Sequence, residues 1–101
     1  MDKLGDMDLF VRVVKNGGLA AAGREIGLSP ASMSARVNAL EERYGTRLLN
    51  RSTRHVSPTE TGQQFYDASL CILADVDEME SQIFAGQESL NGSLRITASS
   101  D

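Results

Sequence analysis

The chain has 101 residues, a formal charge of −4 at pH 7 and a single cysteine. This length supports one domain, and a lone cysteine excludes both an internal disulfide and a cysteine metal cluster. Because the sequence has neither a signal-peptide pattern nor an apolar run long enough to cross a bilayer, we expect a soluble, cytoplasmic protein.

The first predicted element is an amphipathic helix that ends at Asn16-Gly17-Gly18. Its apolar residues recur at helical spacing and are Met7, Leu9, Phe10, Val11, Val13 and Val14. A second helix is predicted from Leu19 to Ile26. Its run Ala20-Ala21-Ala22-Gly23 has almost no side-chain bulk, so a neighbouring helix can cross it at short distance.

The turn Gly27-Leu28-Ser29-Pro30 predicts that a third helix follows at once. Gly27 suits the left-handed conformation that ends a helix, and Ser29 is an N-cap residue. Pro30 fits the first helical position, where its missing N–H costs nothing. Two helices joined this tightly indicate a helix-turn-helix, and Gly45 is expected to end the second of them.

The third helix has two different sides. An apolar stripe at helical spacing is predicted to be core and consists of Met33, Val37, Leu40 and Tyr44. The opposite side carries short or hydrogen-bonding residues, namely Ala31, Ser32, Ala35, Asn38 and Ala39, flanked by Ser34 and Arg36. Such a surface suits close approach to base edges in a major groove. The alternative is the solvated face of an ordinary surface helix.

Residues 47–56 are typical of a short β-hairpin with a polar tip. Arginines are spaced along it, where guanidinium groups suit phosphate oxygens. We expect this wing to flank the DNA groove through Arg47, Arg51, Thr53 and Arg54.

A long helix is predicted next, and either Thr59 or Thr61 can cap its start. Its heptad seam has one polar member and consists of Phe65, Ser69, Ile72, Val76, Met79 and Ile83. A helix of about 27 residues is about 40 Å long, which exceeds so small a fold. We therefore predict that a second copy of the chain covers the seam. The alternative is that the helix packs only on its own domain.

Charge is divided between these parts. Residues 1–55 carry nine Lys and Arg against six Asp and Glu, whereas residues 56–101 carry one against eight. Any direct contact with DNA is therefore expected from the first, basic part. Cys71 lies in the acidic part and is expected to be a small buried apolar residue, the alternative being redox pairing across a dimer.

The sequence lends no support to catalysis. His55 is the only histidine, so no histidine-based triad or multi-histidine metal site can form. No glycine-rich phosphate loop follows a strand. Two other classes of function stay open: an acidic coiled-coil scaffold whose helix-turn-helix makes only protein contacts, and a small enzyme that uses the carboxylates Asp75, Asp77, Glu78 and Glu80.

Taken together, these residues resemble the LysR-type bacterial transcription regulators. The resemblance extends from about Met7 to Gly62 and rests on Phe10-Val11-x-Val13-Val14, Ala21-Ala22, Leu28-Ser29-Pro30, Ser34, Leu40-Glu41, Gly45, Arg47-Leu48-Leu49-x-Arg51, Arg54 and Thr59-x-Thr61-Gly62. It implies a mainly α fold, a winged helix-turn-helix with a three-helix core and a short β-hairpin, followed by a long dimerisation helix. It also implies sequence-specific binding of double-stranded DNA by a homodimer on an inverted repeat, with the recognition helix in the major groove.

The resemblance implies three parts: a DNA-binding domain in residues 1–58, a linker helix in 59–88, and a hinge with the start of an effector-binding domain in 89–101. Family members usually carry a larger C-terminal domain that binds a small-molecule effector. We therefore expect the front piece of a longer protein that forms higher oligomers, with no cofactor, metal or catalytic residue in this piece.

The residues expected to bind DNA lie within the helix-turn-helix of Leu19 to Asn38 and are Ser29, Pro30, Ala31, Ser32, Ser34, Ala35, Arg36 and Asn38. The expected dimer interface consists of Phe65, Ile72, Val76, Met79 and Ile83.

Three positions depart from the family's usual pattern. Gly18 stands where a serine often caps the first helix of the motif, so that cap comes from elsewhere or is weaker. Ala35 stands where an arginine or lysine commonly touches DNA, and Arg36, roughly 100° further round the helix, can replace the charge but not the geometry. Leu49 replaces a frequent phenylalanine, a change within the core chemistry.

Overall fold

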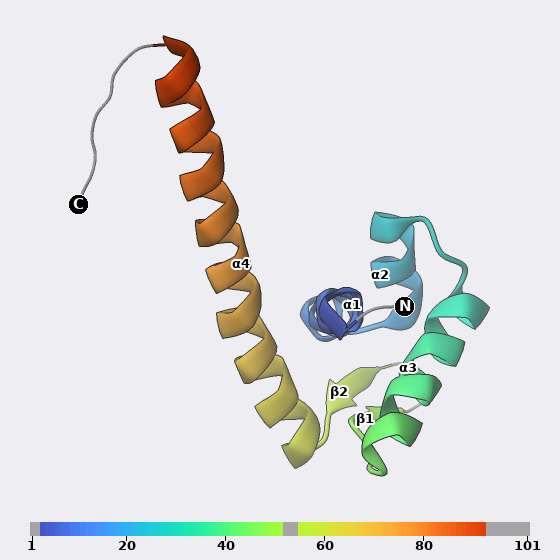
Figure 1. Cartoon of the computed structure of the whole chain (residues 1–101). Coiled ribbons are helices and arrows are strands. Elements are labelled where there is room, and N and C mark those ends of the chain that lie inside the picture. The colour runs from blue at the N-terminus through green and yellow to red at the C-terminus, as the bar shows by residue number, and fades with distance from the viewer. Residues whose placement is uncertain (1–2, 52–54, 93–101) are drawn as a thin grey trace.

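The computed structural model describes residues 3–51 and 55–92. Its elements follow in the order α1 (Lys3–Asn16), α2 (Leu19–Ile26), α3 (Pro30–Tyr44), β1 (Leu49–Arg51), β2 (Val56–Pro58) and α4 (Glu60–Gly92). The first three helices and the hairpin form a body, from which α4 extends as an arm (Figure 1). This is the predicted winged helix-turn-helix followed by a long helix.

A single core holds the body together. Its buried side chains come from all three helices and from the start of the hairpin, and are Leu9, Phe10, Val13, Ala22, Met33, Val37, Leu40, Leu48 and Leu49. The apolar stripe predicted for α3 is thus buried, with one exception. The prediction that Tyr44 belongs to the core is wrong, because its side chain is 47% exposed. It lies in the last turn of α3, where its ring is 5.8 Å from the Phe65 ring centroid at the start of α4, and the Arg43 guanidinium lies over it at 6.0 Å.

Arg12 joins α1 to α2 at the surface of the body. Its Nε donates a hydrogen bond to Asp8 (3.0 Å) and its Nη1 donates to Glu25 (3.1 Å). These bonds, to Asp8 first, raise the pKa of Arg12 above its ordinary value. A raised pKa adds folding stability that is fully present at any pH below the ordinary pKa of arginine. Arg12 therefore adds no pH dependence to stability near neutral pH.

Thr59 caps α4 and ties it to the wing. Its Oγ1 accepts from the Gly62 N–H (3.0 Å) and donates to the Arg47 carbonyl (2.7 Å), while its own N–H donates to the Leu48 carbonyl (3.0 Å). Gly62 lies so close to that Leu48 carbonyl that a Cβ would overlap it. The joint between wing and helix therefore has no room for a side chain at this position.

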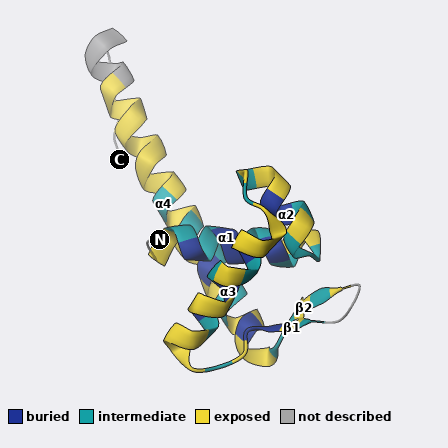
Figure 2. Ribbon diagram, turned by 90° about the vertical axis from the view of Figure 1, so that its right-hand side faces the viewer, coloured by how far each residue is buried: buried dark blue, intermediate teal, exposed yellow. Residues whose placement is uncertain are grey.

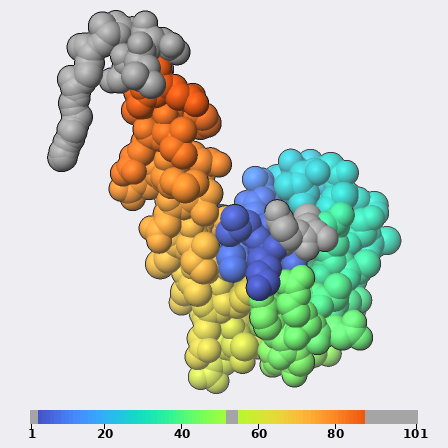
Figure 3. Space-filling view, in the orientation of Figure 1, coloured from blue at the N-terminus to red at the C-terminus, as the bar shows by residue number. Residues whose placement is uncertain are grey.

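The first turns of α4 pack on its own body. Phe65 meets Phe10 edge to face with 5.1 Å between ring centroids, and Ser69 is 1% exposed. Further along the arm, four large apolar side chains are exposed: Ile72, Met79, Ile83 and Phe84. Figure 2 colours most of the described outer part of α4 as exposed, and Figure 3 shows the arm standing clear of the body. Cys71 is exposed in the single chain, contrary to the prediction that it is buried.

The end of α4 differs from the prediction. The helix continues to Gly92, past the expected end at residue 88, so Asn91-Gly92 is helical where a hinge was expected. At 33 residues it is about 50 Å long. Residues 93–101, which hold the rest of the predicted hinge and strand, lie outside the described residues.

Candidate nucleic-acid interface

The turn between α2 and α3 has the geometry that its sequence predicts. Gly27 ends α2 in the left-handed conformation with φ of 77°, and Ser29 caps α3 by accepting from the Ser32 N–H (3.1 Å). Pro30 follows in the first helical position. Gly23 allows the close crossing, because a Cβ there would overlap the Leu28 carbonyl oxygen. Gly18, as expected from its lack of a side chain, provides no side-chain cap for α2.

The side of α3 opposite the core faces solvent. Its exposed residues are Ala31, Ser32, Ala35, Asn38 and Ala39, whereas Ser34 and Arg36 are half-buried. The Ser29 hydroxyl donates to Ser32 Oγ (3.1 Å), which leaves the Ser32 hydroxyl proton available for an acceptor outside the protein. This side can therefore offer donors, acceptors and methyl groups to a flat surface.

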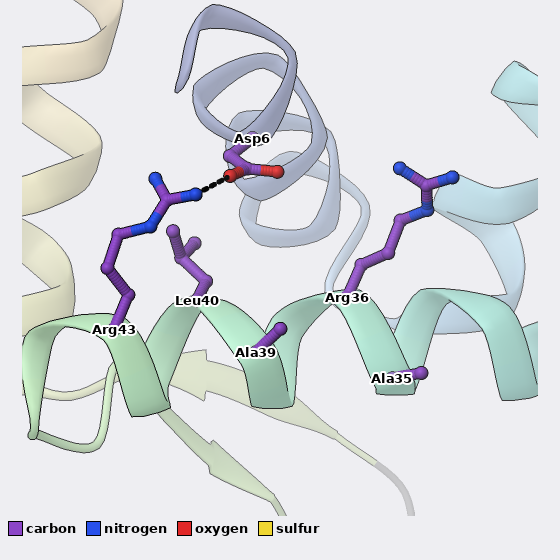
Figure 4. Close-up of a pocket in the computed structure, with 6 residues that line it drawn as sticks. All are labelled: Asp6, Ala35, Arg36, Ala39, Leu40 and Arg43. Atoms are coloured by element: carbon purple, nitrogen blue, oxygen red, sulfur yellow. Dashed lines mark ion pairs between the residues drawn. The ribbon is translucent and has the colours of Figure 1, made fainter. Parts of the chain in front are cut away.

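Arg36 does not occupy the place that Ala35 leaves without charge. It rises from the side of α3 that also carries Leu40 and Arg43 and faces α1 (Figure 4). These residues, with Asp6, Ala35 and Ala39, line an open groove of about 340 Å³. Arg43 pairs there with the buried Asp6, with 3.3 Å between Nη2 and Oδ2. The cationic group of Arg36 thus lies beside the outward surface and not on it.

The wing brings one exposed and one enclosed arginine to α3. Strands β1 and β2 pair antiparallel, with Asn50 opposite Ser57. The Arg47 side chain is 70% exposed and that of Arg51 is 26% exposed. Thr53 and Arg54, the other two predicted wing contacts, lie outside the described residues.

Glu41 is a functional candidate whose role is not evident from its sequence context. Its carboxylate accepts from the backbone N–H groups of Leu48 (2.8 Å) and Leu49 (3.0 Å), and it lies near both Arg47 and Arg51. The only signal in the sequence is its pairing with Leu40 in the family pattern. Its partners lie at the start of the wing, six or more residues further along the chain, so spacing on the helix does not identify them.

Within residues 3–51 and 55–92, no group of three or more His, Cys, Asp and Glu residues is placed to hold a metal ion. Over the same part of the chain, no helix is both long and apolar enough to span a membrane.

A three-helix body with a hairpin wing, and a third helix that turns short hydrogen-bonding residues outward, defines a winged helix-turn-helix protein. The model of the bacterial regulatory helix-turn-helix proteins of the lysR family matches residues 4–63. The chain belongs to this family, and the resemblance found in its sequence is confirmed.

Curated relatives agree with this assignment. Over 96 residues the chain is 41% identical to an HTH-type transcriptional repressor of Pseudomonas aeruginosa, which covers 95% of this chain and 30% of the relative. Over 100 residues it is 37% identical to the HTH-type transcriptional activator AaeR of Escherichia coli, with 99% and 32% covered. The chain thus spans about a third of the length of these relatives.

Solved structures share the fold. The BenM DNA-binding domain in complex with catB site 1 DNA superimposes with a TM-score of 0.78 at 30% identity, covering 83% of this chain and 94% of that one. The CbnR DNA-binding domain in complex with DNA gives a TM-score of 0.77 at 26% identity, covering 85% and 99%.

Proposed function

We propose that this chain is the sequence-specific, double-stranded DNA-binding module of a LysR-type transcription regulator. The observation that carries the proposal is the outward side of α3, where Ala31, Ser32, Ala35 and Asn38 are exposed together. None of them is large enough to hold the helix out of a major groove. The proposal is further supported by relatives named as transcriptional regulators and by two similar domains crystallised with DNA.

The side chains divide into reading and positioning groups. Ser32 and Asn38 offer hydrogen bonds to base edges, and the methyl groups of Ala31 and Ala35 suit contact with thymine methyls. Ser29 and Pro30 bring the N-terminus of α3 close to the backbone, where the positive end of the helix dipole favours phosphate. Ser34, Arg36 and Arg47 flank this surface and are proposed to contact phosphates, together with Thr53 and Arg54 of the wing.

A gel-shift titration against random-sequence duplexes, followed by selection of the bound sequences, tests the proposal. We expect a salt-dependent affinity for any duplex and a selected sequence that binds about 10³-fold tighter or better. Absence of salt-dependent binding would contradict the proposal and favour the scaffold alternative. Binding without sequence preference would contradict its reading part alone.

We propose that the arm makes a homodimer, which would place two modules on an inverted repeat. The exposed seam residues Ile72, Met79 and Ile83, with the half-buried Val76 between them, support this. Water-exposed apolar side chains in one row on a helix need a partner surface. Phe65, also predicted for this interface, packs on Phe10 and Tyr44 of its own body, so we propose an interface that begins at Ile72.

The remaining expectations concern the whole protein and are part of the same proposal. Residues 1–58 bind DNA, residues 59–88 link the dimer, and residues 89–101 lead into a domain that binds a small-molecule effector and supports higher oligomers. Because bacterial DNA lies in the cytoplasm, we propose a cytoplasmic location. We propose that the chain acts by binding alone and is not an enzyme.

A further inference from the structure

The Glu41 carboxylate attaches the start of the wing to α3. Glu41 lies in the last turns of α3, its side chain is 12% exposed, and Oε2 accepts from the N–H groups of both Leu48 and Leu49. These two residues lead into β1, so the hairpin begins at a fixed place beside the helix. Two charge-assisted hydrogen bonds to one carboxylate oxygen make this a strong attachment.

Arg51, at the other end of β1, returns to the same helix. Its Nη2 lies 3.6 Å from Glu41 Oε1, and its Nη1 donates a long hydrogen bond of 3.4 Å to Ser34 Oγ. Since Ser34 and Glu41 are seven residues apart, the guanidinium group bridges two positions about 10 Å apart along the recognition helix. Its Nε and Nη2 are buried without a hydrogen-bond partner among the described residues.

Arg47 carries the same charge as Arg51 but is much more exposed and lies farther from Glu41. It approaches the same Glu41 carboxylate, but at 4.0 Å, and its side chain is 70% exposed. An exposed arginine can turn toward a phosphate with little loss, whereas Arg51 would have to leave both Glu41 and Ser34. The two arginines therefore form a matched pair on one wing.

We infer that Arg51 is a positioning residue that fixes the wing against the recognition helix through Glu41 and Ser34, and that it neutralises no DNA phosphate. This inference rests on the proposed function and revises the expectation that Arg51 is a phosphate contact. A guanidinium group suits the role, because its rigid planar fork reaches two partners at once. Holding the wing in place before binding spares the free energy of ordering it on the DNA.

The salt dependence of DNA affinity separates the two roles. For the whole chain on a random-sequence duplex, we expect Arg47→Met to reduce the slope of log affinity against log salt by about 0.9. We expect Arg51→Met to leave this slope unchanged and to weaken binding by a constant factor of roughly 3 to 10 at every salt concentration. Arg51→Lys keeps the charge but not the fork, so it is expected to weaken binding equally.

Hydrogen exchange provides a readout that does not involve DNA. In Glu41→Gln and in Arg51→Met we expect faster exchange at the amides of Leu48 and Leu49, while amides in the core of α1 stay protected. If Arg51→Met lowers the melting temperature of the body, the same exchange measurement is made on Arg51→Lys, which keeps the charge and is expected to stay folded.

Three other results would contradict either the inference about Arg51 or the proposed function. A slope reduced by about 0.9 in Arg51→Met, or full affinity in Arg51→Lys, makes Arg51 a phosphate contact and overturns the inference alone. Unchanged exchange at the Leu48 and Leu49 amides in both variants would show that Glu41 and Arg51 do not hold the wing against α3. A wild-type chain without salt-dependent affinity overturns the proposed function itself, and this result is seen before any variant is made.

Discussion

Two glycines of the helix-turn-helix have opposite requirements. Gly23 is buried, and a Cβ there would overlap the Leu28 carbonyl oxygen and meet Met33 Cγ at 3.0 Å, whereas Gly18 has no heavy atom within 4 Å of a Cβ. We expect Gly23→Ala to lower the free energy of unfolding by about 1 to 3 kcal/mol, although alanine favours helix. Urea unfolding of the variant and of the unaltered chain measures this difference in the free energy of unfolding.

Gly18→Ser is the control for that change, since it adds the missing side-chain cap at a position with open space. We expect it to raise the free energy of unfolding by a few tenths of a kcal/mol. Equal stability of Gly23→Ala and the unaltered chain would show that α2 and α3 can move apart without loss.

Ser32 is the sharpest test of base reading. It is exposed, and Ser32→Ala keeps the backbone bond to the Ser29 cap while removing the hydroxyl that faces outward. We expect a loss of about 1 to 3 kcal/mol on the selected site, little change on random DNA and an unchanged melting temperature.

Ser29→Ala serves as the comparison, because it removes the cap and is expected to lower stability by about 1 kcal/mol. If Ser32→Ala weakened binding equally on selected and random DNA, Ser32 would position the helix and read no base.

At the residue scale, local chemistry was predictable and long-range partners were not. Ser29, Pro30 and Gly27 act on their own backbone, so their roles follow from the adjacent sequence. Tyr44 continues the apolar spacing of α3, but its burial depends on what lies beside the last turn. The partners of Glu41 depend on where the hairpin folds back.

At the scale of the element, the arm carries the proposed dimer. Val76 lies between the exposed Ile72 and Met79, so a carboxylate there would be desolvated opposite its own copy. We expect Val76→Asp to be monomeric in sedimentation at micromolar concentration.

Asp75→Asn is the matched control for Val76→Asp, since it alters an exposed neighbour outside the seam and is expected to leave the dimer intact. A dimer that persists in Val76→Asp would contradict the assignment of the interface to this seam.

The heptad seam of α4 was predictable as a pattern, but its occupant was not. Phe65 and Ser69 follow the same spacing as Ile72 and Met79, yet the first pair packs on the body and the second is exposed. Spacing identifies the buried side of a helix and does not say which surface buries it. The end of α4 was placed too early because the family resemblance assigned Asn91-Gly92 to a hinge, whereas the helix includes both residues.

At the scale of the whole molecule, charge follows the division between body and arm. Helix α4 contains acidic residues and no lysine or arginine, whereas the residues before the wing tip are basic in sum. The arm is therefore repelled by DNA phosphates while the body is attracted. This division follows from the sequence alone, since it needs only the order of the residues.

The tight joint at Thr59 and Gly62 fixes the position of the body relative to the arm. Because it binds the start of α4 to the wing without spare room, each body in the proposed dimer keeps one angle to the shared arm. One alanine inserted directly before Ile72 would turn the bodies by about 100° and shift them by about 1.5 Å.

We expect this insertion to leave the body folded but to select operators with altered half-site spacing, in a selection where that spacing varies. An unchanged preferred spacing would show that the joint bends. With a stiff joint, the distance between the two bodies sets the number of base pairs between half-sites. The proposed dimer would then select operators by this spacing, although no side chain touches the bases in between.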